Sequence, residues 1–521
     1  MTTLNRLGRH DSWEGVRALV TGMGVSGFAA ADNLTHVGAT VLAVDDSDAG
    51  DRSEKATILE ILGADVRLGP GSTAGLPEEY AWDQIDVVVT SPGWKPSAPL
   101  LAAAAQHGVP IWGEVELAWR LRDPHLEAPW LAVTGTNGKT TTVQMLDAIL
   151  RTAGLRSIAC GNVGLPVIEA IMDPEPYDVY VVELSSYQLH YTHSMRCESA
   201  AVLNVAEDHL DWYPDMAAYA ADKGRIYEGV RTACVYNVGD ETTEYLVREA
   251  DVVEGARAIG FTLGMPGVGM VGLVDDILAD RAFIEQRAHN AAELCNVADL
   301  ASPAPHFIAN ALAAAALARS HGVPTIAVRD GLRSFQPDGH RIADAGEVDG
   351  VRYVDDSKAT NPHAAQSSLS AYEPVVWIAG GLAKGASFDS LVKSARDRLR
   401  AVVLLGRDRG VIAAALGRHA PDVPVIEIAD GETSVMDRAV RAAADLAHPG
   451  DTVLLAPGCA SMDQFENYGA RGDAFVAAVR ALGTPRLNRT DPTRICPDPA
   501  WLQRVWRRCC GECDGDGRGG C

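Results

Sequence analysis

The sequence predicts an α/β protein of three domains, each built on a mostly parallel sheet with helices on both faces. Short apolar runs alternate with Ala-rich helical segments along most of the chain, which is the pattern of β-α-β units. The length of 521 residues exceeds what one hydrophobic core can organise. Many of the apolar runs end in Gly-rich or acidic loops, the place where parallel sheets bind their ligands.

The first domain, residues 1–127, is expected to be Rossmann-like. A strand over Val16–Thr21 leads into Gly22-x-Gly24-x-x-Gly27 and a helix, which reads as a dinucleotide-binding turn but is a weak signal alone. Further strands are expected over Thr40–Val44, ending at Asp45-Asp46, and over Ile85–Thr90. A polar, Pro-bearing linker over 122–129 closes this domain.

The second and third domains are expected over residues 128–337 and 338–487. The second should be a P-loop ATPase-like parallel sheet with a long helix over Ile308–His321, and the third Rossmann-like. The expected strands are Trp130–Thr134, Ser157–Cys160, Asp178–Glu183 and Ala200–Val205 in the second domain, and Val351–Val354, Val375–Ala379, Ala401–Leu405, Val425–Ile428 and Thr452–Leu455 in the third. The Cys-rich tail, 488–521, is predicted to be disordered.

Composition narrows the class of protein. A formal net charge of −24 argues against a nucleic-acid partner. No apolar run reaches the roughly 18 residues that a membrane span needs, and the first 15 residues lack the apolar core of a signal peptide. Five of the ten cysteines are scattered singly before the tail, as in a reducing compartment. A cytoplasmic protein that does not insert into membranes is therefore expected.

The most specific motif is Gly135-Thr136-Asn137-Gly138-Lys139-Thr140-Thr141, which follows the strand Trp130–Thr134 and opens a helix. Backbone N–H groups at such a helix start surround phosphate oxygens. Lys139 would reach the terminal phosphates of ATP, and the Thr140 hydroxyl would bind Mg²⁺. The usual first glycine of the P-loop is replaced by Val133, so the loop is a shortened version.

Two later strand ends offer further ligands for a cation. Glu183 ends an apolar strand, and His209 lies among acids after the next strand, in Asn204-Val-Ala-Glu-Asp208-His209. Carboxylate, imidazole and hydroxyl groups at one edge of a parallel sheet are suited to Mg²⁺ beside a nucleotide. Thr140, Glu183 and His209 are the predicted metal ligands.

Taken together with Glu183-Leu-Ser-Ser-Tyr-Gln188 and Asp355-Asp-Ser-Lys358-Ala-Thr360-Asn361, these motifs resemble the Mur ligases over about residues 15–485, in the same order. The resemblance is strongest to the member that adds D-glutamate. It implies that ATP phosphorylates the carboxylate of UDP-N-acetylmuramoyl-L-alanine and that the amine of D-glutamate displaces the phosphate, in peptidoglycan precursor synthesis. It further implies two Mg²⁺ ions, a carbamylated Lys223 as an additional ligand, and a monomer.

The resemblance also assigns binding residues. Those implied for ATP, besides the loop, are Asn310, Arg341 and Asp356. Those implied for the nucleotide-sugar substrate are Asp45, Asp46, Asn162, Ser185 and Gln188, and those implied for D-glutamate are Thr360, Lys384, Ser461, Met462 and Tyr468. The sequence departs from the family at Phe307, where an Asn is usual, which puts one polar contact near ATP in doubt.

Other classes remain open at this point. Another Mur-type ligase or a folylpolyglutamate-type ligase would share the central domain, although the latter lacks a Rossmann-like unit before its phosphate loop. A nicotinamide-dependent enzyme would use the first glycine motif, but it has no need of the ATP loop. A nucleotide-switched binding module would hydrolyse ATP without an acceptor. Cys510-Gly-Glu-Cys513 has the spacing of a zinc half-site but lacks a well-placed second pair.

Overall fold

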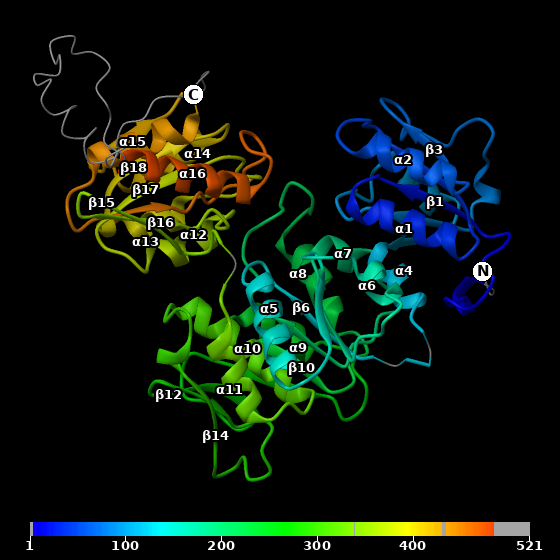
Figure 1. The fold of residues 1–521 in the computed structure, drawn as a ribbon, viewed down its shortest axis with the longest axis horizontal. Helices are drawn as coiled ribbons and strands as arrows, with labels where there is room; N and C mark the ends of the chain where they lie inside the picture. Colours follow the sequence, from blue (N-terminus) through cyan, green and yellow to red (C-terminus); the bar gives the residue numbers. More distant parts are fainter. Residues whose placement is uncertain (1–3, 124, 127, 338, 430–433, 484–521) are drawn as a thin grey trace, which may run out of the picture.

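The computed structural model describes residues 4–123, 125–126, 128–337, 339–429 and 434–483. The expected tail at 488–521 lies outside these residues. Three sheets follow one another along the chain, and we call the parts built on them the first, central and third regions. In Figure 1 the first region (blue) and the third region (yellow to orange) lie on opposite sides of the central one.

The first region contains a five-stranded parallel sheet in the order β3-β2-β1-β4-β5. Its strands β1, β2 and β4 are almost wholly buried because helices cover both faces. The elements are β1 (Arg17–Thr21), α1 (Val25–His36), β2 (Thr40–Asp45), α2 (Arg52–Ile61), β3 (Asp65–Leu68), β4 (Val87–Thr90), α3 (Pro99–Gln106), β5 (Ile111–Gly113) and α4 (Glu114–Arg120).

The central region is a nine-stranded sheet in the order β14-β13-β12-β11-β10-β9-β6-β8-β7. Its strands are β6 (Trp130–Thr134), β7 (Ser157–Gly161), β8 (Val179–Glu183), β9 (Ser199–Val202), β10 (Ala233–Asn237), β11 (Arg257–Phe261), β12 (Met270–Val274), β13 (Ile277–Asp280) and β14 (Ala292–Asn296). Every pair of neighbouring strands from β7 to β12 in this order is parallel. The β12–β13 and β13–β14 pairs are antiparallel.

The helices of the central region are α5 (Lys139–Thr152), α6 (Val167–Met172), α7 (Ser186–His190), α8 (Met216–Gly224), α9 (Glu241–Arg248), α10 (Pro305–Ser320) and α11 (Thr325–Ser334). Helix α10 is Ala-rich and buried along most of its length, because α5, α11 and the sheet pack around it. Small side chains allow this close approach of helix to helix. The packing fixes α5, and with it the loop that opens α5.

The third region has a six-stranded sheet in the order β15-β16-β20-β17-β18-β19, parallel except for the β15–β16 pair. Helices α12, α13 and α14 cover one face, and α15 and α16 cover the other. The elements are β15 (Ala343–Val348), β16 (Val351–Asp355), α12 (Pro362–Leu369), β17 (Val375–Gly380), α13 (Asp389–Ala395), β18 (Leu399–Leu405), α14 (Arg409–His419), β19 (Val425–Glu427), α15 (Val435–Leu446), β20 (Thr452–Leu455) and α16 (Tyr468–Leu482).

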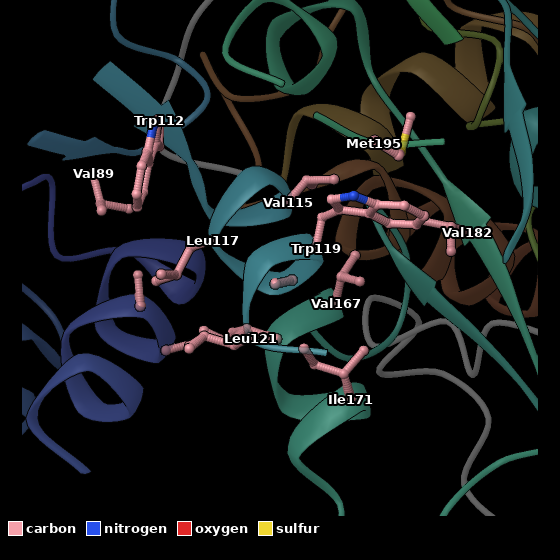
Figure 2. Packing of buried hydrophobic residues seen from close by; sticks show 14 of the residues in the cluster. Val89, Trp112, Val115, Leu117, Trp119, Leu121, Val167, Ile171, Val182 and Met195 are labelled. Atoms are coloured by element: carbon pink, nitrogen blue, oxygen red, sulfur yellow. The ribbon is translucent and has the colours of Figure 1, made fainter. Parts of the chain in front are cut away.

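One apolar core continues from the first region into the central one (Figure 2). Helix α4 presents Val115, Leu117 and Trp119 to this core, and Val167 and Ile171 of α6 meet them from the central side. The ring of Trp119 packs edge-on against Trp130 with centroids 4.9 Å apart. The first two regions are therefore joined by a hydrophobic interface and not only by a linker.

The predicted fold class is confirmed: three sheet-containing α/β regions, parallel for the most part. The predicted strands Trp130–Thr134 and Thr452–Leu455 have the observed bounds. The antiparallel strands β13, β14 and β15 were not predicted, because each is short or lies at the edge of its sheet, where a strand carries little periodic signal. Among the described helices, none is both long and apolar enough to cross a membrane.

Candidate active site

The phosphate loop connects the carboxyl end of β6 to α5. Gly135 and Gly138 have φ angles of +155° and +82°, and a Cβ atom built on Gly138 would lie 2.3 Å from the Asn310 Oδ1 atom. A residue with a side chain would therefore clash with α10 at this position. The Asn137 N–H donates to Asn204 Oδ1 at 2.8 Å and ties the loop to the residues after β9. The sequence prediction of a strand, a glycine turn and a helix is confirmed.

Two lysines converge on this loop, Lys139 half-buried and Lys223 buried. Lys139 Nζ donates to the carbonyl oxygens of Gly135 and Thr136 at 2.8 and 3.0 Å, and Lys223 Nζ, from α8, donates to the same Gly135 oxygen at 2.9 Å. Burial lowers the pKa of Lys139. Burial, together with the charge of Lys139, lowers the pKa of Lys223 well below its usual value. Two lysine amino groups at one carbonyl oxygen form a site that a bound anion would stabilise.

Glu183, at the end of β8, places a buried carboxylate near these lysines. The side chain is buried, and its Oε1 atom accepts a hydrogen bond from Asn162 Nδ2 at 2.8 Å. Its Oε2 atom is buried without a hydrogen-bond partner among the described residues. A buried carboxylate oxygen without a donor is costly, and a bound cation would satisfy it. An oxygen donor of this kind is suited to Mg²⁺, and Thr140, another predicted ligand, is buried at the first turn of α5. Among the described residues, no three His, Cys, Asp or Glu side chains are arranged to hold a metal ion by themselves.

His209 lies in the loop after β9 with a φ angle of +59°. Its Nδ1 atom shares a hydrogen bond of 2.6 Å with the Tyr187 hydroxyl, from α7, and its Nε2 atom is 3.7 Å from Asp208 Oδ2. Burial lowers the pKa of His209 to about 4, against the opposing pull of Asp208. The imidazole is therefore neutral near pH 7, which is the form that binds metal ions.

The third region brings further groups to the same place. Arg341 Nη1 donates to Thr141 Oγ1 at 2.8 Å, across the boundary between the regions. The charge of Lys384 contributes to the lowered pKa of both Lys139 and His209, so this lysine lies in their neighbourhood. Asp356 is buried, receives the Ser368 hydroxyl, and has its pKa raised to about 6 by burial.

The remaining predicted residues of the third region differ in exposure. Ser461 is buried and Thr360 half-buried, whereas Met462 is 68% exposed and Tyr468 is 37% exposed. The Tyr468 ring is covered by the Lys358 ammonium group, 3.9 Å from its centroid. Met462 and Tyr468 are therefore on an open surface in this arrangement.

The residues predicted to bind the nucleotide sugar already have hydrogen-bond partners within the protein. Ser185 and Gln188 form a capping box at the start of α7. Asp45 accepts from the Met23 N–H at 2.7 Å in the first region. Hydrogen bonds from Thr73, opposed by some burial, lower the pKa of Asp46. These side chains support the loops at the ends of β8 and β2.

Three features of the site were not predicted from sequence. Tyr187 was read only as part of a motif, yet it is the partner of His209. Asn361 reaches across to Asn137. Phe307 was expected near ATP, but its ring is buried in the hydrophobic core against Phe335, with centroids 6.2 Å apart. An apolar residue at the first turn of a buried helix is the signal that would have placed Phe307 in the core.

Comparison with known proteins shows the family of the chain. The Mur ligase middle domain matches residues 133–318, and the "Mur ligase, glutamate ligase domain" matches residues 340–459. The UDP-N-acetylmuramoylalanine–D-glutamate ligase of Streptomyces avermitilis is 61% identical over 91% of this chain and 99% of its own length. The enzyme of the same name from Mycolicibacterium smegmatis is 47% identical over 90% and 97%. The structure of MurF from Acinetobacter baumannii, at 15% identity, aligns with a TM-score of 0.55 over 88% of this chain and 93% of its own, a likeness of fold.

The relatives show an ATP-dependent ligase that forms amide bonds, here with three α/β regions and a Gly-rich loop, Gly135–Thr141, in the central one. The chain belongs to the Mur ligase family, and within it to the UDP-N-acetylmuramoylalanine–D-glutamate ligases.

Proposed function

We propose that the protein joins D-glutamate to UDP-N-acetylmuramoyl-L-alanine at the expense of ATP, within peptidoglycan precursor synthesis. The observation that carries the proposal is the meeting of Lys139, Lys223 and the unpaired Glu183 oxygen beneath one phosphate loop. Lysine amino groups beside a buried, unsatisfied carboxylate suit an anion and a metal ion held together, as in a magnesium nucleotide. The identity with the D-glutamate ligases supports the choice of substrates.

In this proposal the loop holds the phosphates of ATP. The N–H groups at the start of α5 and the Lys139 ammonium group face the terminal phosphates. Asn310 lies against Gly138 of the loop, and Arg341 donates a hydrogen bond to Thr141. Asp356, in the third region, is near enough to Arg341 for their charges to interact. These three residues are proposed to contact the rest of the nucleotide.

The metal ions are proposed to be two Mg²⁺. Thr140, Glu183 and His209 supply oxygen and nitrogen ligands, and Lys223 supplies a further oxygen once it is carbamylated. Carbamylation joins the uncharged amine to CO₂ and releases one proton, and burial of Lys223 favours the uncharged amine. Bound Mg²⁺ would neutralise the charge that builds up on the phosphate oxygens.

The two organic substrates are proposed to approach from the outer regions. The first region would hold the UDP group, with Asp45 and Asp46 shaping its loop, and Asn162, Ser185 and Gln188 would lie along the sugar and its alanyl arm. In the third region, Thr360, Lys384, Ser461, Met462 and Tyr468 would bind D-glutamate. A dicarboxylic acid needs a cation and several hydrogen-bond donors, and this set provides them.

The chemistry then runs in two steps. The alanyl carboxylate attacks the terminal phosphorus of ATP, forming an acyl phosphate and ADP. The uncharged amine of D-glutamate adds to the acyl carbon, and inorganic phosphate leaves as the amide forms and the amine loses its proton. Lys139 stabilises negative oxygen in the first step, since its ammonium group lies at the phosphate loop. We further propose that the enzyme acts as a monomer in the cytoplasm, with domains over 1–127, 128–337 and 338–487.

Phosphate release measures this function directly. With ATP, Mg²⁺ and UDP-N-acetylmuramoyl-L-alanine present, phosphate should appear when D-glutamate is added, and not with L-glutamate or meso-diaminopimelate. Omission of the nucleotide sugar is the control, because a nucleotide-switched module would hydrolyse ATP without it. Equal turnover with another amino acid would assign the protein to a different ligase of the family.

A further inference from the structure

Asn361 precedes α12 in the third region, and its side chain makes two kinds of contact. The Oδ1 atom accepts the Ala364 N–H at 2.9 Å and caps the helix. The Nδ2 group donates to Asn137 Oδ1 at 2.9 Å and lies 3.4 Å from Asp208 Oδ2, both in the central region. Helix capping accounts for the hydrogen bond that the oxygen accepts from Ala364, but it does not account for the contacts that the amide nitrogen makes with the central region.

The other end of this contact is firmly held. Asn137 lies within the phosphate loop, and its main chain exchanges two hydrogen bonds with the Asn204 side chain, at 2.8 and 3.1 Å. Asn361 is itself 5% exposed. Because both partners are fixed by their own regions, a bond between them constrains how the two regions meet.

Few other polar contacts join the two regions at this point. Arg341 reaches Thr141 at 2.8 Å, and Asn137 Nδ2 is 3.1 Å from His363 Nδ1, also at the start of α12. The residue before Asn361 is Thr360, one of the proposed D-glutamate ligands. The position of Asn361 therefore determines how Thr360, as part of the proposed D-glutamate site, is placed relative to the phosphate loop.

We propose that Asn361 is a positioning residue, whose amide N–H group links the third region to the phosphate loop and so presents D-glutamate to the activated carboxylate. The inference rests on the proposed function for its substrates. The link is made by side chains of the protein itself, so its effect on the arrangement of the two regions can be measured separately from turnover. Asn361 acts through Asn137 and Asp208 and does not need to touch a reacting atom.

Asn361→Asp separates the link from the helix cap. The new carboxylate keeps an acceptor for the Ala364 N–H, so α12 should remain capped. It removes the donor to Asn137 Oδ1 and places a negative charge beside the Asp208 carboxylate, which is repulsive, while the acceptor for Asn137 Nδ2, 3.4 Å from Asn361 Oδ1, is kept. The matched control is Asn467→Asp, because Asn467 caps α16 through the Ala470 N–H at 2.9 Å and makes no hydrogen bond to the central region among those seen in the described chain.

Both variants should unfold at the temperature of the parent protein. Small-angle X-ray scattering without ligands should show longer inter-region distances for Asn361→Asp only. The kcat/KM for D-glutamate should fall roughly tenfold or more, as expected for loss of one hydrogen bond to a well-placed group, while the KM for the nucleotide sugar stays unchanged. In a double-mutant cycle, the loss of kcat/KM in the Asn137→Ser, Asn361→Ser double variant should be smaller than the product of the two single losses, because both substitutions remove the same link.

The proposed link would be overturned if Asn361→Asp and Asn467→Asp gave the same scattering profile and the same kcat/KM for D-glutamate. Additive losses in the Asn137 and Asn361 cycle would also contradict it, since the two residues would then act separately. A parent protein that releases no phosphate with D-glutamate would instead reject the proposed function. The scattering comparison without ligands would still test the link in that case.

Discussion

At the scale of single residues, the site is defined by groups whose charges are held away from water. Lys139 and Lys223 donate to the same carbonyl oxygen of Gly135, an arrangement that is unfavourable unless anions or modification relieve it. Glu183 has one buried oxygen without a donor among the described residues. A role in binding ligands explains these features, whereas a contribution to the stability of the fold does not.

Lys139→Ala should reduce kcat/KM by about 10²- to 10³-fold, because it removes the charge that stabilises the transferring phosphoryl group. The fold should persist, since a cation is lost from a pocket that disfavours cations. Steady-state phosphate release measures the loss. Lys393→Ala, at an exposed position of α13, is the control and should retain full activity; an active Lys139→Ala enzyme would remove the loop from the mechanism.

Tyr187→Phe should weaken Mn²⁺ binding roughly tenfold, because the hydroxyl that orients His209 is lost. Electron paramagnetic resonance of free Mn²⁺, without ATP, reports this affinity directly. Tyr213→Phe serves as the comparison, since its ring stacks on Tyr187 at 6.0 Å while its hydroxyl is not bonded to His209. Equal Mn²⁺ affinities for the two variants would show that the Tyr187 hydroxyl does not support the metal site.

At the scale of elements, α4 shows how a short helix can join two regions. Every residue from Glu114 to Trp119 is buried. Glu116 accepts from the N–H groups of His193 and Ser194 at 2.7 and 2.9 Å. Glu114 Oε1 accepts the Ile168 N–H at 2.6 Å, near the start of α6. Two carboxylates from the first region thus satisfy main-chain donors of the central region.

Glu114 predicts a pH dependence of stability. Burial raises its pKa to about 7 from the usual 4.5 of a glutamate, so the folded protein holds this proton more tightly than the unfolded chain does. Its contribution should therefore decline as pH rises from about 4.5 to 7 and stay constant above. Glu114→Gln keeps an acceptor for Ile168 and should remove this decline, by up to about 3 kcal/mol between pH 5 and 8. Urea unfolding of both proteins across this range measures it; parallel pH profiles would contradict the assignment.

At the scale of the whole molecule, the three regions are joined in two different ways. The first and central regions share an apolar core around Trp119 and Trp130 (Figure 2). The third region meets the phosphate loop through polar contacts such as Arg341 to Thr141 and Asn361 to Asn137. A large apolar interface favours a fixed arrangement, and a small polar one permits movement.

Trp119→Ala should therefore lower the free energy of unfolding by about 3–5 kcal/mol, as for removal of a large buried aromatic side chain. It should also allow the first region to unfold before the central one, giving two transitions in differential scanning calorimetry. Trp82→Ala is the control, because Trp82 is half-buried and stacks on His107 within the first region, at 5.8 Å. A single, equally cooperative transition for both variants would show that the shared core does not couple the regions.

The sequence alone determined the fold class, the membership of the Mur ligases and the strand, glycine turn and helix around Gly135 to Thr141, because strand periodicity, glycine spacing and the order of motifs are local patterns. Only the tertiary structure decided that Lys139 and Lys223 share a carbonyl, that Tyr187 holds His209, that Phe307 is a core residue, and that Asn361 meets Asn137. These pairs are separated widely along the chain or depend on which face of a helix is covered. Burial, pKa and hydrogen-bond partners are properties of neighbours in space, and a linear pattern does not contain them.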